Sequence, residues 1–167
     1  MDVGTVAYGQ GIAVTPLQLA MAYAAIANGG TLYRPYVVAA TRDAEGEHRT
    51  APVAIRSPIS ADTADTLRTM LVSTVDRGIA HGASLPGYSV GGKTGTAQIP
   101  SDDGRYVDDA YISSFAGFVP ASDPRFAVVI VLERPQTKLL GTVTAMQTFH
   151  DLVVDVLRNA RVQPDRP

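Results

Sequence analysis

The segment Ala127–Leu132 reads Ala-Val-Val-Ile-Val-Leu, an unbroken apolar run rich in β-branched residues. Such a run is typical of a β-strand that is covered on both faces and central in its sheet, because a strand with one solvent face alternates apolar and polar residues. A central strand needs a neighbour along each edge, and residues 112–119 form one convincing neighbour. The chain offers no obvious second neighbour, and an open apolar edge promotes aggregation. We therefore expect strands encoded elsewhere to pair here.

Two helices are predicted from their capping residues. Thr15 and Gln18 form a capping box, and the helix that they open continues to Ala27. This helix is apolar almost all round, which predicts that it is buried. Ser60 is predicted to cap a second helix, which carries apolar residues at helical spacing and ends at Gly78.

A third helix is predicted near the end of the chain. Thr144 is its expected N-cap, with Gln147 as the partner in a capping box. Apolar residues at helical spacing predict its inner face, namely Met146, Phe149, Val153, Val156 and Leu157. The tail from Arg161 is polar, and we expect it to fray.

The remaining periodic segments have the composition of β-strands. Residues 31–42 and 50–55 are predicted to form a short peripheral hairpin. A further strand is predicted at residues 91–99, and residues 112–119 and 126–132 are predicted to pair as a second hairpin. The predicted fold class is α+β, with helices packed on a mostly antiparallel sheet.

Composition limits the function classes that are open to the chain. Its 167 residues, 46% of them hydrophobic, are enough for one domain with a core. The net charge of -2 argues against a nucleic-acid surface, which needs a basic excess, and the lack of Cys excludes thiolate catalysis and disulfides. The first residues do not resemble a signal peptide and no stretch has the length of a membrane span, so the chain as written is expected to be soluble.

One segment carries the chemistry, and it permits two interpretations. Gly87, Gly92, Lys93 and Thr94 formally match a phosphate-binding loop. That loop must follow a buried strand and open a helix, whereas the residues after Thr94 include Gly95 and a proline at position 100. A nucleotide-binding protein is therefore the less favoured interpretation.

The second interpretation places Lys93-Thr94-Gly95-Thr96 on a strand. Gly95 would let the backbone of a ligand approach closely, and Thr94 and Thr96 would offer hydroxyl groups to a carboxylate from one face. Lys93 would add a positive charge beside them. The amide of Thr96 could donate to a developing oxyanion.

These residues resemble a known family. Lys93-Thr94-Gly95 resembles the third signature of the penicillin-binding serine acyltransferases. The surrounding sequence at residues 9–20, 87–98 and 115–129 resembles the class B, high-molecular-weight penicillin-binding proteins, and the resemblance covers most of the chain in the same order.

The resemblance implies a penicillin-binding, serine β-lactamase-like transpeptidase fold and a D,D-transpeptidase that cross-links peptidoglycan in cell division or cell-shape maintenance. A Ser attacks the D-Ala-D-Ala stem peptide, and β-lactams acylate the same Ser. Lys93 would support the proton and charge network near the reacting Ser. Thr94 and Thr96 would hold the substrate carboxylate, with Gly95 between them. The Thr96 amide would form half of the oxyanion hole. No metal or organic cofactor is implied. The family is anchored at the extracytoplasmic face of the bacterial cell membrane, where other cell-wall synthesis proteins are expected partners.

The sequence departs from the family pattern in one respect. Within residues 1–167 no Ser is followed by Lys three positions later or by Asn two positions later, so Ser-x-x-Lys and Ser-x-Asn are both missing. We therefore expect residues 1–167 to be the C-terminal portion of a single transpeptidase domain, truncated at its N-terminal side, and activity of this chain alone is not expected. A catalytically inactive remnant that binds a carboxylate or peptide is the alternative.

Overall fold

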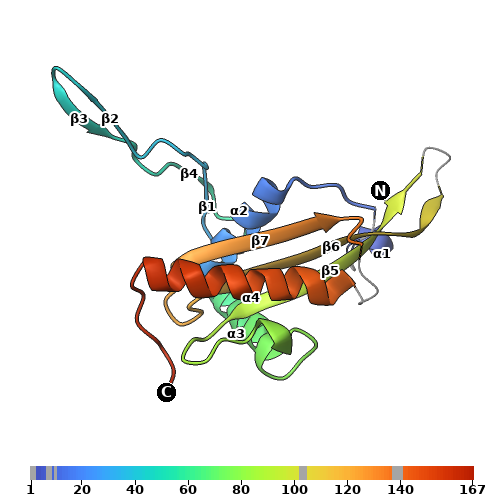
Figure 1. Cartoon of the computed structure of the whole chain (residues 1–167). Coiled ribbons are helices and arrows are strands. Elements are labelled where there is room, and N and C mark those ends of the chain that lie inside the picture. Colours follow the sequence, from blue (N-terminus) through green and yellow to red (C-terminus); the bar gives the residue numbers. More distant parts are fainter. Residues whose placement is uncertain (1–2, 7–8, 10, 102–104, 137–140) are drawn as a thin grey trace.

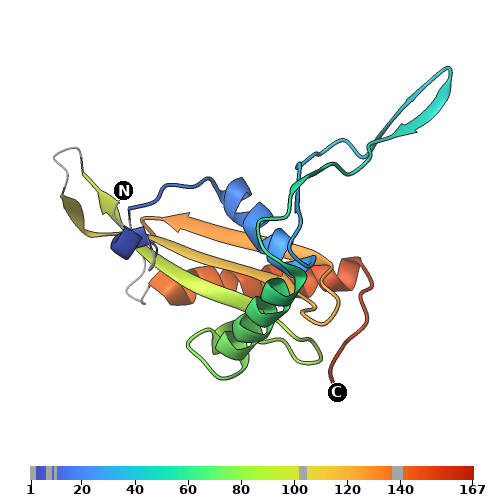
Figure 2. The ribbon, with the colours of Figure 1, turned by 180° about the vertical axis from the view of Figure 1, so that it is seen from behind.

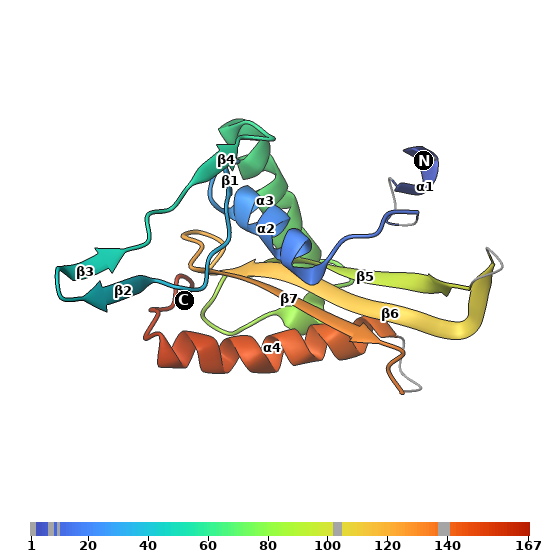
Figure 3. The same cartoon turned by 90° about the horizontal axis from the view of Figure 1, so that it is seen from above.

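The computed structural model describes all of the chain except residues 1–2, 7–8, 10, 102–104 and 137–140. Three layers stack on one another: two helices, a β-sheet and a third helix (Figures 1 and 3). The short helix α1 (Val3–Val6) lies outside this stack, whereas the short helix η1 (His81–Ala83) packs against α4 and α3. Among the described residues, no helix has the length and apolar character that a membrane span requires.

The sheet consists of three antiparallel strands in the order β5-β6-β7. They are β5 (Gly91–Pro100), β6 (Tyr106–Val119) and β7 (Phe126–Glu133). Thr94 faces Phe115 across the first pair of strands, and Phe115 faces Ile130 across the second. The predicted antiparallel sheet is confirmed, although β6 begins six residues before the predicted strand, because it continues to pair with the far end of β5.

Helices α2 (Pro16–Ala27) and α3 (Ala61–Asp76) begin where their capping residues predict. The hydroxyl of Thr15 accepts a hydrogen bond from the Gln18 amide at 3.2 Å, and the Gln18 side chain accepts one from the Thr15 amide at 2.8 Å. Ser60 caps α3 by accepting from the Thr63 amide at 3.1 Å. These bonds satisfy amides that the first helical turn leaves without partners.

Helix α4 (Gly141–Asn159) covers the opposite face of the sheet (Figure 3). Its predicted inner face is confirmed, since Phe149 and Val153 are fully buried and the Phe149 ring lies 4.5 Å from that of Phe115. The predicted start at Thr144 is wrong, because the helix already includes residues 141–143. Thr144 therefore sits inside the first turns and does not cap them.

The apolar strand β7 has the cover and the single neighbour that its sequence predicts within this chain. Its two faces are covered as expected, by α2 on one side and α4 on the other (Figures 1 and 2). Among the described residues it pairs with β6 alone, so its one predicted neighbour within this chain is confirmed, and a second neighbour encoded elsewhere stays a prediction. The unbroken apolar pattern reflects the helices that cover both faces of the strand.

Helix α2 is less buried than its composition predicts. Ala27 is buried against Phe118 of the sheet, whereas Leu17 at the other end is 57% exposed. An apolar groove of about 590 Å³ runs beside the helix, with Met21 and Ile55 among its lining residues. An apolar helix with one open side indicates a surface that other parts of a larger domain would cover.

The predicted peripheral hairpin is confirmed as a projecting arm (Figure 2). Two ladders build it: β1 (Leu32–Tyr33) pairs with β4 (Ala54–Arg56), and β2 (Ala40–Asp43) pairs with β3 (Gly46–Arg49). The Asp43 carboxylate closes the turn by accepting from the amides of residues 45 and 46 at 2.8 and 3.2 Å. The hydrogen bonds from these amides and from His48 hold the pKa of Asp43 below its usual value.

Candidate active site

The four predicted site residues, Lys93-Thr94-Gly95-Thr96, lie consecutively on β5. Among the described residues β5 pairs only with β6, so no strand lies along its other edge. Two carbonyls of β5 are already engaged, since that of Gly92 accepts from Thr74 and that of Thr94 accepts from Lys93. The strand overturns the phosphate-loop interpretation, because Gly92, Lys93 and Thr94 belong to β5 and do not open a helix.

Lys93 presents an available positive charge. Its side chain is exposed, and the ammonium group donates to the Thr94 carbonyl at 2.9 Å and to the Thr94 hydroxyl at 3.4 Å. No carboxylate in the described parts of the chain forms an ion pair with it. The charge can therefore interact with a reacting group or a bound anion.

The two threonines occupy different environments. They lie on the same face of β5 by the alternation of the strand, as the sequence predicts. Thr94 is only 7% exposed and faces Phe115, whereas Thr96 is exposed and faces Ser113. In this structure Thr96 is therefore the residue that presents its hydroxyl to solvent.

Gly95 makes room for a side chain of the neighbouring strand. A Cβ atom at this position would lie 2.5 Å from the hydroxyl oxygen of Ser114, which stands opposite it on β6. The Ser114 hydroxyl also approaches the Gly95 carbonyl at 3.5 Å. Sequence reasoning assigned this space to a ligand, and it did not foresee the cross-strand partner.

The two glycines before Lys93 are needed for packing. A Cβ atom on Gly91 would lie 2.5 Å from the ring of Phe118, and one on Gly92 would lie 2.5 Å from the ring of Phe115. Because successive residues point to opposite faces of a strand, the two glycines let an aromatic ring lie close on each face of β5. This packing fixes the strand directly before the site.

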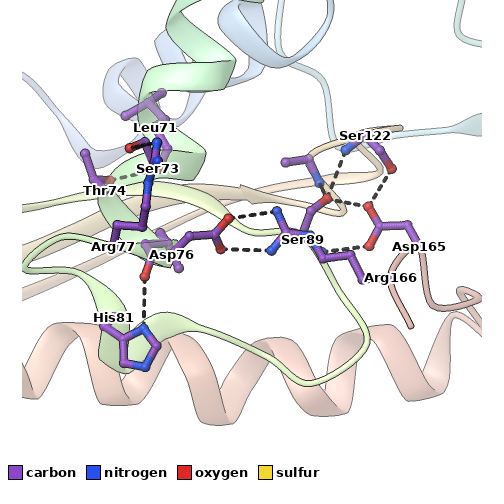
Figure 4. Close-up of polar contacts among 12 residues, drawn as sticks. Leu71, Ser73, Thr74, Asp76, Arg77, His81, Ser89, Ser122, Asp165 and Arg166 are labelled. Carbon is purple, nitrogen blue, oxygen red and sulfur yellow. Dashed lines mark hydrogen bonds and ion pairs between the residues drawn. The ribbon is translucent and has the colours of Figure 1, made fainter.

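Contacts from distant segments also hold the start of β5, and sequence reasoning missed them. The hydroxyl of Thr74 on α3 donates to the Gly92 carbonyl, next to Lys93. Ser89, just before the strand, is buried and bonds to Asp165 near the C-terminus (Figure 4). These partners are far apart in the sequence, so no local pattern marks them.

Residues 1–153 match the family model described as the penicillin binding protein transpeptidase domain. The chain belongs to this family. It is 38% identical over 98% of its length to stage V sporulation protein D of Bacillus subtilis, and 35% identical over 96% of its length to the peptidoglycan D,D-transpeptidase FtsI of Escherichia coli K12. The chain spans 26% of the length of each of these two relatives.

A solved structure supports the same assignment. Penicillin-binding protein 3 of Mycobacterium tuberculosis, complexed with ampicillin, superposes with a TM-score of 0.83 at 35% identity, over 95% of this chain and 37% of that one. The α+β fold predicted from the sequence is therefore confirmed as that of a penicillin-binding transpeptidase domain.

Proposed function

We propose that this chain supplies the substrate-binding strand of a peptidoglycan cross-linking D,D-transpeptidase. The observation that carries the proposal is the position of Lys93-Thr94-Gly95-Thr96 on the open edge of β5, in a fold shared with a relative solved with ampicillin. An extended peptide can lie along such an edge and bond to its backbone. A D-Ala-D-Ala stem peptide, or a β-lactam that mimics it, is the ligand.

The reaction is an acyl transfer that proceeds in two steps. A Ser hydroxyl attacks the carbonyl carbon between the two D-Ala residues, and D-Ala leaves with a proton. The acyl group then passes to the amine of a neighbouring stem peptide. Lys93 stabilises the charges that develop near the Ser, and the Thr96 hydroxyl binds the terminal carboxylate. The Thr96 amide donates to the oxyanion, and one such donor is worth roughly 3 kcal/mol.

Residues 1–167 form the C-terminal portion of a single transpeptidase domain, and residues outside this chain contribute the nucleophile. Three observations support this division: the absence of Ser-x-x-Lys from the sequence, the edge of β7 that no described strand pairs with, and the exposed side of α2. The whole protein is anchored at the extracytoplasmic face of the bacterial cell membrane, where it meets peptidoglycan and other cell-wall synthesis proteins.

Covalent labelling tests the function. The full-length protein that contains this chain should gain the mass of one ampicillin molecule per polypeptide, because the acyl-enzyme is slow to release. Mass spectrometry of the intact protein measures the adduct. Reversible binding of a D-Ala-D-Ala peptide without any adduct would favour the binding remnant, and the absence of both would contradict the proposal.

The Thr96 hydroxyl has its own test. Thr96→Val in the full-length protein should lower the second-order rate constant for acylation by ampicillin roughly tenfold to a hundredfold, because a hydrogen bond to a carboxylate is lost. Stopped-flow measurement with a fluorescent penicillin gives this constant. Thr69→Val is the matched control, since Thr69 is exposed on α3 and its hydroxyl only donates to its own helix. Equal rates for the Thr96 variant and the wild type would remove Thr96 from the site.

The isolated chain should self-associate in solution. The open edge of β7 is apolar, and Val131 on this strand is 39% exposed, so the strands of two copies can pair. Sedimentation velocity measures the association, and Val131→Lys should reduce it by placing a charge on the edge. A monomer with one sharp, cooperative thermal transition would argue against an incomplete sheet.

A further inference from the structure

The C-terminal segment 162–166, called here the strap, does not fray as its polar sequence predicts. It crosses back over residues 87–89, directly before β5. The Tyr88 hydroxyl donates to the Val162 carbonyl at 2.8 Å, and the amides of Asp165 and Arg166 donate to the Gly87 carbonyl at 3.0 and 3.1 Å. Long-range bonds of this kind hold the end of a chain that local sequence would leave free.

The carboxylate of Asp165 makes the side-chain hydrogen bonds that join the strap to Ser89 and Ser122 (Figure 4). One of its oxygens accepts from the Ser89 amide at 2.7 Å, and the other accepts from the hydroxyls of Ser89 and Ser122. Ser89 is buried, and its hydroxyl oxygen also accepts from the amides of Ala121 and Ser122 at 2.8 and 3.1 Å. The donor and both acceptor positions of the Ser89 hydroxyl are therefore in use.

This network closes one end of the ladder that carries the site. Ser89 lies two residues before β5, and residues 121–122 lie just after β6. Both segments lie close in sequence to Gly91 and Phe118, which form the first residue pair of that ladder. Asp165 thus joins the segment that leads into β5 to the segment that follows β6. Its contact in the first of these segments, Ser89, lies four residues before Lys93.

Arg166 extends the strap to α3. Its guanidinium group forms two bonds to the carboxylate of Asp76, the last residue of that helix, at 2.8 and 2.9 Å (Figure 4). Two residues earlier, Thr74 donates to the Gly92 carbonyl. The strap therefore holds the segment that leads into β5, and Thr74 bonds to the strand itself, next to Lys93.

Asp165 keeps its charge at neutral pH. Burial raises its pKa, but hydrogen bonds from Ser122 and Ser89 outweigh that effect, and the pKa lies below its usual value. A charged acceptor forms stronger hydrogen bonds than a neutral one, so the ionised Asp165 carboxylate holds the two segments together more firmly than a neutral group would.

From this geometry we propose that Asp165 is a positioning residue, which sets the register and rigidity of β5 so that Lys93 and Thr96 are held in the reactive arrangement. The kinetic consequence rests on the proposed function, whereas the effect on β5 does not. Loss of position of about 1 Å can lower a rate a hundredfold, so a residue without contact to the substrate can control the reaction.

The test compares Asp165→Ala with Asp155→Ala in the full-length protein. Asp155 is a matched control, because it is an exposed carboxylate that only pairs with Arg158 on α4. Asp165→Ala should lower the acylation rate constant with ampicillin on the order of tenfold to a hundredfold, while the fraction of protein that becomes labelled stays unchanged. Hydrogen exchange of residues 90–98 should become faster, while exchange of residues 145–157 should not.

Each outcome decides the proposal. A fall in the labelled fraction with an unchanged rate constant would show a role in stability alone and would overturn it, as would unchanged exchange in β5. Asp165→Asn retains one carbonyl oxygen for the Ser89 amide and should recover part of the rate. If Asp165→Ala fails to fold, Ser122→Ala removes a single bond to the carboxylate and should show the same changes at smaller size. If the wild-type protein forms no adduct with ampicillin, the proposed function fails. Hydrogen exchange of residues 90–98 still tests whether Asp165 holds β5 in place.

Discussion

Lys93→Ala is expected to slow acylation of the full-length protein by ampicillin at least about a hundredfold, the range found when a positioned proton-transfer group is lost. The fold should survive, because the side chain is exposed and donates only to the neighbouring residue Thr94. Stopped-flow kinetics with a fluorescent penicillin measures the rate constant, and circular dichroism checks the fold.

Arg158→Ala is the control for the loss of one positive charge. Arg158 is an exposed cation on α4, where it pairs with Asp155, and it lies on a different layer from β5. This variant should acylate at the wild-type rate. If Lys93→Ala also did so, Lys93 would have no part in the reaction, and the assignment of the strand as an active-site wall would lose its main support.

Phe149→Ala is expected to lower the free energy of unfolding by about 3–5 kcal/mol, the cost of removing a large aromatic side chain from a packed core. The Phe149 ring is fully buried and lies 4.5 Å from the ring of Phe115, which in turn fills the space over Gly92. The loss therefore affects both the attachment of α4 and the packing beneath β5. Urea unfolding of the transpeptidase domain, followed by far-ultraviolet circular dichroism, measures it.

Leu152→Ala is the matched control on the same helix. Leu152 is 44% exposed, so its truncation should cost less than about 1 kcal/mol. If Phe149→Ala lowered the free energy of unfolding as little as Leu152→Ala, the buried face of α4 would not be what holds the helix to the sheet.

Local interactions explain why much of the fold could be predicted. Thr15 and Ser60 cap their helices through bonds to residues three positions away, so a short stretch of sequence contains both partners. Strands β5 and β7 were recognised from their composition, and the inner face of α4 from its helical spacing. In each case, the deciding information lies within one element.

The errors arise where distant segments decide the outcome. The strap was predicted to fray because Asp165 and Arg166 are polar, yet their partners Ser89 and Asp76 lie far back along the chain. For β7, the composition indicates only that both faces are covered, and whether a second strand pairs with it depends on residues outside this segment.

The candidate site depends on both local and distant residues. Its motif is four consecutive residues, so the sequence alone predicts Lys93 and Thr96 as site residues, and the structure shows that both are exposed on β5. The partners that hold the strand could not be seen, because Thr74 and Ser114 approach it from α3 and β6. Composition alone also could not distinguish the buried Thr94 from the exposed Thr96.

The projecting β2–β3 arm has a practical consequence for work on this protein. Both of its strands are almost wholly exposed, and its turn is closed by the carboxylate of Asp43 and the amides of residues 45 and 46. Folding of the three layers does not depend on the tip, and exposed tips are where chains accept inserted sequence. A short peptide tag, or a cysteine that carries a fluorophore, could therefore be placed at Glu45, on the arm that projects from the three layers (Figure 1). Residues 1–167 contain no cysteine that would compete for the dye.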